Sequence, residues 1–106
     1  MVQSDERRKH DRVPISIAVQ YEDHQETVVV QSVDISLGGL FLGSSDPAAP
    51  GTDLALTLKL PAPYGHVMAR GVVVHCLMGI GMGVEFRGFP DDGEARLRDY
   101  IDSLQA

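Results

Sequence analysis

The sequence places four positively charged side chains within the six residues RRKHDR, at positions 7–12. Arg8 and Arg12 form an R-x-x-x-R pattern in this run, and Arg7 directly precedes it. An arginine guanidinium makes bidentate hydrogen bonds to phosphate, and the same fork fits the O6 and N7 acceptors of guanine. The run therefore suits a compact anion that carries phosphates or a purine base, although a basic tail in solvent is the alternative.

A second pattern with the chemistry of a binding site is DISLGG, at positions 34–39. Asp34, Ser36 and Gly39 form D-x-S-x-x-G. The Asp34 carboxylate can accept hydrogen bonds from the N–H groups on the Watson–Crick edge of guanine, and Ser36 can donate one to an anion. Because Gly38 and Gly39 have no Cβ, their backbone N–H groups can approach a ligand closely.

The segment between the two patterns has the periodicity of two strands joined by a turn. Apolar residues alternate with polar or small ones over 13–21, which is strand spacing. A polar run at 22–26 predicts the turn, and β-branched residues dominate the second strand at 27–36. An antiparallel hairpin returns the chain to its starting point, so the two patterns should meet in space. The predicted binding site consists of Arg8, Arg12, Asp34, Ser36, Gly38 and Gly39.

The rest of the chain reads as short strands followed by one helix. We expect strands near 40–42, 53–60, 66–77 and 79–86, and an amphipathic helix near 91–105. Six short antiparallel strands usually close into a barrel or a sandwich, which protects their edges. In the last strand glycine alternates with larger residues, which leaves room on one face for another backbone, a helix or a ligand.

The domain organisation follows from length and periodicity. At 106 residues the chain has the size of one domain. Residues 1–12 show no apolar periodicity and predict a flexible basic arm that carries R-x-x-x-R, whereas residues 13–106 predict the barrel with its C-terminal helix. The polar start shows no signal peptide, and no apolar stretch is long enough to cross a membrane. We therefore expect a cytoplasmic protein without membrane insertion.

The distribution of charge argues against a nucleic-acid partner. The chain has a formal net charge of −6, yet four of its nine Lys and Arg residues lie in the run at 7–12. An acidic body repels a long polyanion, whereas a short basic arm can still hold a compact anion. A barrel that binds single-stranded nucleic acid also needs stacking aromatics along a basic groove, and the chain has three Phe and three Tyr.

Catalytic and metal sites are not indicated by the sequence. It contains no GxSxG, HExxH or CxxC motif and no P-loop lysine motif, so we expect no enzyme. The four histidines, His10, His24, His66 and His75, lack metal-ligand spacing. Cys76 is the single cysteine, which excludes an intramolecular disulfide and agrees with a reducing compartment. His75 and Cys76 are best read as strand neighbours, one facing in and one facing out.

Together, the sequences ERRKHDRVPI, DISLGGLFL and GIGMGVEF resemble a PilZ domain, the bacterial receptor module for cyclic di-GMP. The resemblance covers essentially the whole chain, and the order and spacing of both patterns match. It implies a mainly β fold: a six-stranded antiparallel barrel with a C-terminal helix. By the family pattern, Arg8 and Arg12 would clamp phosphates and guanine faces, while Asp34, Ser36 and Gly39 would line the guanine pocket.

The resemblance also implies how such a protein would act. A solitary receptor would change its surface when cyclic di-GMP binds and regulate an unidentified partner protein in motility, pili or attachment. An arginine at the position of Arg7 resembles the members that take two intercalated ligand molecules. His75 and Cys76 are further candidates for the pocket wall, although the sequence does not settle which way each faces. The alternative is an interaction adaptor that keeps the PilZ fold without binding a ligand.

Overall fold

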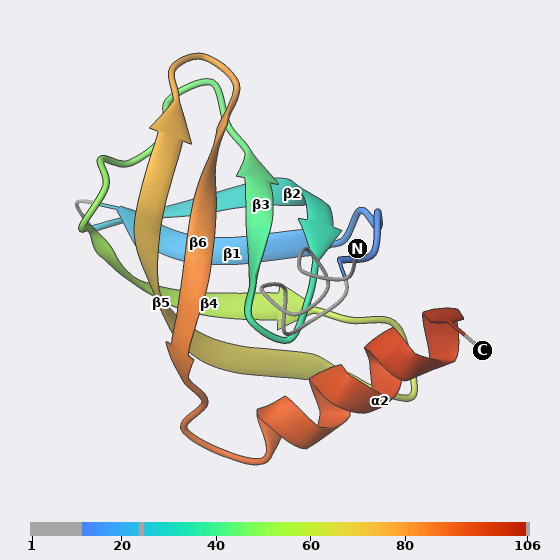
Figure 1. The fold of residues 1–106 in the computed structure, drawn as a ribbon. Coiled ribbons are helices and arrows are strands. Elements are labelled where there is room, and N and C mark those ends of the chain that lie inside the picture. Colours follow the sequence, from blue (N-terminus) through green and yellow to red (C-terminus); the bar gives the residue numbers. More distant parts are fainter. Residues whose placement is uncertain (1–11, 24, 106) are drawn as a thin grey trace, which may run out of the picture.

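In the computed structural model, which describes residues 12–23 and 25–105, six antiparallel strands close into a barrel and a helix follows (Figure 1). The elements are β1 (Ala18–Asp23), β2 (Glu26–Ile35), β3 (Gly39–Gly43), β4 (Asp53–Lys59), β5 (His66–Leu77), β6 (Gly81–Gly88) and α2 (Gly93–Gln105). Around the barrel the strand order is β1-β2-β3-β6-β5-β4. The predicted mainly β barrel with a C-terminal helix is confirmed, whereas the predicted flexible arm lies largely outside the described residues.

The hydrophobic core fills the inside of the barrel. Strand alternation sends every second side chain inward, as the spacing of Leu54, Leu56 and Leu58 in β4 predicts. These three side chains are buried, together with apolar residues from the other strands. Those residues include Val19, Tyr21, Leu40, Leu42, Val67, Ala69, Val73, Met82 and Val84.

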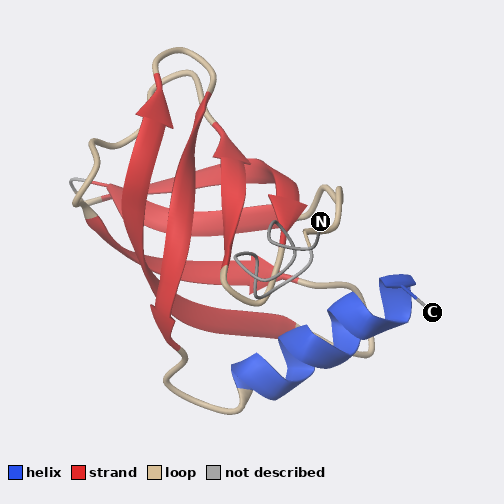
Figure 2. Ribbon diagram, viewed as in Figure 1, coloured by secondary structure: helices blue, strands red, loops and turns tan. Residues whose placement is uncertain are grey.

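The helix α2 packs against β5 at one end of the barrel (Figure 2). Its start is capped by Asp91, whose Oδ1 accepts a hydrogen bond from the backbone N–H of Gly93 at 2.9 Å. The helical spacing of apolar residues places three of them in the core, namely Leu97, Tyr100 and Ile101. Leu104 continues the spacing but stays exposed. No helix within the described part of the chain is long and apolar enough to cross a membrane.

The first strand begins later than the alternation over 13–21 predicts. β1 starts at Ala18, and the chain before it contacts β2 through an isolated bridge between Val13 and Ile35. In this bridge each residue donates its N–H to the carbonyl of the other, at 2.9 and 3.0 Å. Pro14 follows at once and has no N–H to continue a ladder.

A buried serine side chain replaces the missing part of the ladder. The hydroxyl of Ser32 in β2 accepts a hydrogen bond from the N–H of Ile17 at 3.0 Å and donates one to the carbonyl of Ile15 at 2.6 Å. Ser32 is 3% exposed, so water cannot take over these bonds. The side chain therefore holds the segment that leads back to Arg12 against β2.

A glycine lets β3 and β6 approach closely where β3 begins. Gly39 pairs with Glu85, and a Cβ at Gly39 would collide with the carbonyl oxygen of Val84 and stand 3.1 Å from the Cα of Glu85. The obstacle is backbone, which cannot move aside as a flexible side chain would. A glycine at this position therefore allows the barrel to close between β3 and β6.

Replacing Ser32 by alanine should lower the free energy of unfolding by about 1–3 kcal/mol, because a buried N–H and a partly buried carbonyl lose their partner. Chemical denaturation monitored by circular dichroism measures this change. The matched control is Ser16→Ala, which removes an exposed hydrogen bond to Gln31 and should change the unfolding free energy by less than about 0.5 kcal/mol. Equal stability of the two variants would contradict the anchoring role of Ser32.

Replacing Gly39 by alanine should cost roughly 1–3 kcal/mol or more of unfolding free energy, because the added methyl group meets backbone. Gly88→Ala is the control, since a Cβ there meets no atom within 4 Å. Thermal unfolding of both variants tests this difference. A Gly39→Ala protein as stable as Gly88→Ala would show that β3 and β6 tolerate a wider separation.

Candidate functional site

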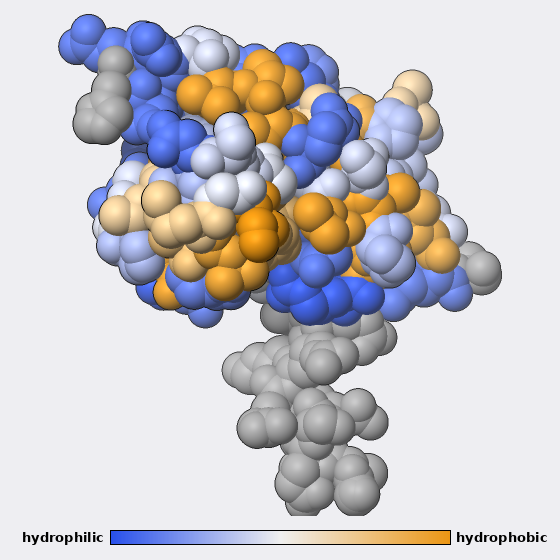
Figure 3. Space-filling view, turned by 90° about the horizontal axis from the view of Figure 1, so that it is seen from above, coloured by the Kyte–Doolittle hydropathy of each residue, from blue (hydrophilic) through white to orange (hydrophobic). Residues whose placement is uncertain are grey.

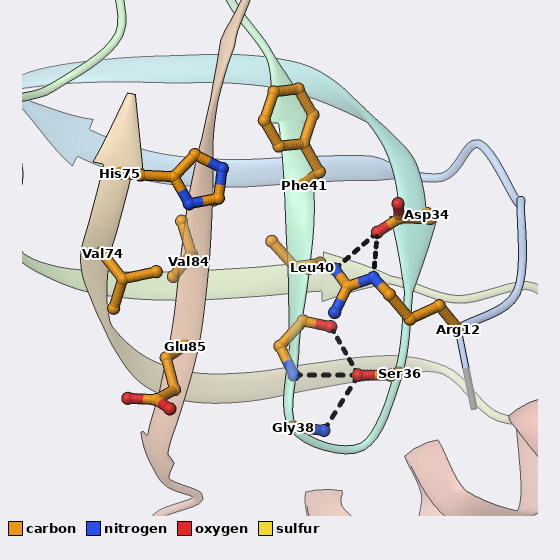
Figure 4. A pocket seen from close by; sticks show the side chains of 12 residues that line it. Arg12, Asp34, Ser36, Gly38, Leu40, Phe41, Val74, His75, Val84 and Glu85 are labelled. Atoms are coloured by element: carbon orange, nitrogen blue, oxygen red, sulfur yellow. Dashed lines mark hydrogen bonds and ion pairs between the residues drawn. The ribbon is translucent and has the colours of Figure 1, made fainter. Parts of the chain in front are cut away.

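The hairpin brings the end of the basic run to the D-x-S-x-x-G turn, as the sequence predicts. The Nη2 of Arg12 lies 2.6 Å from Oδ1 of Asp34, and Nε donates to the same oxygen at 3.1 Å (Figure 4). The two side chains are 42% and 29% exposed, so the pair stays within reach of a ligand. The other two predicted arginines, Arg7 and Arg8, lie outside the described residues.

A β-bulge in β2 determines that Asp34 faces outward. The register with β3 passes from Ser32 directly to Asp34 and leaves Val33 unpaired. Strict alternation from the inward-facing Ser32 would turn Asp34 into the core. The extra residue reverses the alternation, so Ile35 is buried and the carboxylate of Asp34 points to the surface.

The turn after β2 is built around the hydroxyl of Ser36. This oxygen accepts hydrogen bonds from the N–H groups of Gly38 at 3.1 Å and Gly39 at 3.2 Å, and donates to the carbonyl of Gly39 at 3.3 Å. Ser36 is 2% exposed, so its side chain shapes the turn that carries the two glycines. The expected donation from Ser36 to an anion remains a prediction, since the hydroxyl has one proton and the turn uses it here.

An aromatic wall continues the site from Asp34 across β3 to β5. Phe41 from β3 and His75 from β5 have ring centroids 6.0 Å apart and ring planes inclined by 29°. Both rings lie against β6, where Gly81 and Gly83 have no side chains to displace them. The expected room on the glycine face of this strand is thus filled by two rings of the same chain. Sequence reasoning did not single out Phe41, although its place between two inward-facing leucines indicates an outward aromatic.

A second bulge settles the direction of His75 and Cys76. The register of β5 with β6 shifts between Val73 and His75, so Val74 and His75 both face outward. His75 therefore lines the pocket, whereas Cys76 is half-buried and packs against the core. The interpretation of one residue facing in and one facing out is correct, and Cys76 is not a pocket residue.

The Arg12–Asp34 pair and the aromatic wall line a surface pocket of about 450 Å³. Its lining residues are Arg12, Asp34, Ser36, Gly38, Gly39, Leu40, Phe41, Val74, His75, Gly83, Val84 and Glu85. Five of them belong to the predicted site, and they come from both sequence patterns. Among the described residues no group of His, Cys, Asp and Glu could hold a metal ion. The pocket combines a cation, a carboxylate, a half-buried glycine at Gly38 and flat rings, which suits a small anion with an aromatic base.

Solved structures with the same fold include three bacterial proteins. The inhibitor of motility MotI/DgrA from Bacillus subtilis has a TM-score of 0.77 and 22% identity over 93% of this chain and 51% of its own. The PilZ domain of YcgR from Escherichia coli, solved with c-di-GMP, has a TM-score of 0.76 and 17% identity, covering 93% and 92%. The K. pneumonia MrkH–c-di-GMP complex has a TM-score of 0.75 and 20% identity, covering 92% and 51%.

The matched proteins differ in how much of their own length this chain covers. This chain spans about half the length of MotI/DgrA and of MrkH, but nearly all of the YcgR domain. A comparison with curated protein sequences gives no match. The family model of the PilZ domain matches residues 6–103, which is nearly the entire chain. With the barrel, the helix and both sequence patterns in place, this chain belongs to the PilZ domain family.

Proposed function

We propose that this protein is a receptor for cyclic di-GMP that acts by binding, without catalysis, and regulates a partner protein. The observation that carries the proposal is the meeting of Arg12 and Asp34, 22 residues apart in sequence, at one pocket. The YcgR domain and MrkH, which share the fold, were solved with c-di-GMP. A PilZ barrel with Arg12 and Asp34, one residue from each pattern, at its surface supports the same function here.

The residues of the pocket have complementary roles toward this ligand. Arg12 uses Nε and Nη2 on a single carboxylate oxygen, and a guanidinium has five N–H donors, so donors remain for a phosphate or a guanine. Asp34 would accept from the Watson–Crick edge of guanine. The N–H groups of Gly38 and Gly39 donate to the hydroxyl of Ser36, so these glycines would form a pocket edge that the ligand can approach without meeting a Cβ.

The N-terminal arm would complete the site. Arg8 would clamp the ligand together with Arg12, and Arg7 would favour a stacked pair of ligand molecules over a single one. Without the phosphates, the positive charges of residues 7–12 repel one another, so the ligand supplies the charge that lets the arm close. This closure costs conformational entropy. The free energy gained from the phosphate and guanine contacts must exceed that cost.

The ligand-bound surface would be read by another protein. In this proposal the arm, the ligand and the barrel form a new surface in the bacterial cytoplasm, and an effector of motility, pili or attachment recognises it. MotI/DgrA, which shares the fold, is an inhibitor of motility.

A second candidate is an adaptor that binds its partner without a ligand. The turn between β5 and β6 exposes three apolar side chains, with Leu77 50%, Met78 75% and Ile80 63% exposed. Figure 3 looks onto this end of the barrel and shows apolar side chains grouped among polar ones. Exposed apolar groups of this kind are typical of interaction surfaces, which favours the adaptor as the alternative.

Amide chemical shifts distinguish the two functions. Adding cyclic di-GMP to the labelled protein should shift the amide signals of residues 7–12 and 34–39, because the ligand contacts both patterns. GTP at the same concentration is the control ligand and should produce smaller shifts. Unchanged spectra with cyclic di-GMP would support the ligand-independent adaptor instead.

Arg8→Ala and Arg12→Ala should each weaken cyclic di-GMP binding by about 1–3 kcal/mol, because each loses charge-assisted hydrogen bonds to the ligand. Isothermal titration calorimetry measures this change and gives the ligand stoichiometry. Arg98→Ala is the control, since Arg98 lies on α2 beside Glu94 and does not line the pocket. Wild-type affinity in both arginine variants would show that these side chains are not ligands.

A further inference from the structure

We propose that Phe41 and His75 form a stacking face for one purine base of the ligand; the inference rests on the proposed binding of cyclic di-GMP. Both side chains line the pocket, and Phe41 lies next to Asp34 across the β2–β3 ladder. The stacking face would supply affinity for a flat base, while Asp34 selects guanine through its edge.

The position of Phe41 serves the pocket rather than the core. Its neighbours in β3, Leu40 and Leu42, are fully buried, whereas Phe41 points outward and stays partly exposed. Phe41 is also the residue that pairs with Asp34 across the β2–β3 ladder. Side chains of such a pair lie about 5 Å apart at Cβ, so a base with its edge on the carboxylate would have its face over the ring.

The position of His75 depends on the bulge in β5. The shift in register after Val73 places His75 opposite Gly83 on the outer face of the barrel, where it is exposed. Figure 4 shows the imidazole and the ring of Phe41 next to each other in front of the strands. Two neighbouring rings inclined by 29° offer a broader flat surface than either ring alone.

The glycines of β6 allow the rings to lie against the sheet. A Cβ at Gly81 would stand 2.6 Å from Cε2 of Phe41, and a Cβ at Gly83 would collide with the imidazole of His75. Larger residues at these positions would therefore lift the rings into the pocket. With one face of each ring resting on the strand, the opposite face remains available to a base.

The test combines calorimetry with proton NMR of the ligand. In the wild type, the guanine H8 signal should move upfield on binding, because it lies over aromatic rings. Phe41→Leu and His75→Ala should each lower the affinity roughly 5- to 150-fold and reduce the H8 shift, as expected when a stacking ring is lost. Phe41→Tyr keeps the ring and should retain both the affinity and the shift.

The control is Phe89→Leu, the same exchange of a ring for an aliphatic chain outside the pocket, where Phe89 packs against Phe86. It should leave the affinity unchanged. If circular dichroism shows that Phe41→Leu is unfolded, His75→Ala decides the matter, because His75 is exposed and lies outside the hydrophobic core.

The outcomes separate this inference from the proposed function. Wild-type affinity and an unchanged H8 shift in His75→Ala and in a folded Phe41→Leu would overturn the stacking face and leave the receptor function intact. An absence of cyclic di-GMP binding in the wild type would overturn the receptor function and the stacking face with it. Weaker binding in both ring variants but not in Phe89→Leu would establish the stacking face.

Discussion

The backbone bridge between Val13 and Ile35 is the constraint on which the site depends. It joins the residue after the basic run to the residue after Asp34, and so places Arg12 and Asp34 within hydrogen-bonding distance. The exposed ion pair itself contributes little to stability, since surface salt bridges are typically worth about 0–1 kcal/mol. The bridge and the buried hydrogen bonds of Ser32 therefore hold the segment with Arg12 beside β2. The side chains of Arg12 and Asp34 can then replace their mutual contact by contacts with a ligand.

The same strands of the barrel contribute side chains to the hydrophobic core and to the pocket on its surface. Its interior must exclude polar groups, yet a binding site on its wall needs a carboxylate, an imidazole and exposed backbone. The bulges at Val33 and Val74 allow both, because an extra residue turns the next side chain outward without moving the following apolar residue out of the core. The tight turn of Ser36 adds two glycines at the pocket edge with their N–H groups held in place.

Charge separation along the chain fits a small anionic ligand. Most of the acidic residues lie beyond the basic run, so the body of the domain is negatively charged and repels long polyanions. This repulsion acts over about one Debye length, about 8–10 Å. The pocket contains one described cation, Arg12, and two carboxylates, Asp34 and Glu85. Glu85 lies near Arg87, which partly offsets its charge. The arginines of the arm would supply the remaining positive charge that a cyclic diphosphate requires.

Much of this protein follows from its sequence alone. Leucines at every second position of 54–60 determine a strand with one buried face, and the hairpin between the two patterns brings the backbone after Arg12 back beside the backbone after Asp34. Both are local properties, since alternation and hairpin return need only neighbouring residues. The start of β1 was not predictable in this way, because the hydroxyl of Ser32, from another strand, replaces its ladder bonds.

The tertiary structure alone decided which side chains face the pocket. Alternation by itself would have turned Asp34 inward, and it left the directions of His75 and Cys76 open. Bulges reverse the alternation at both places, and they form because of how each strand pairs with its neighbour across the barrel. Asp34 pairs with Phe41 and His75 with Gly83, and the alternation within one strand does not show where its partner strand skips a residue. The aromatic wall of Phe41 and His75 likewise exists only because β3, β5 and β6 lie side by side.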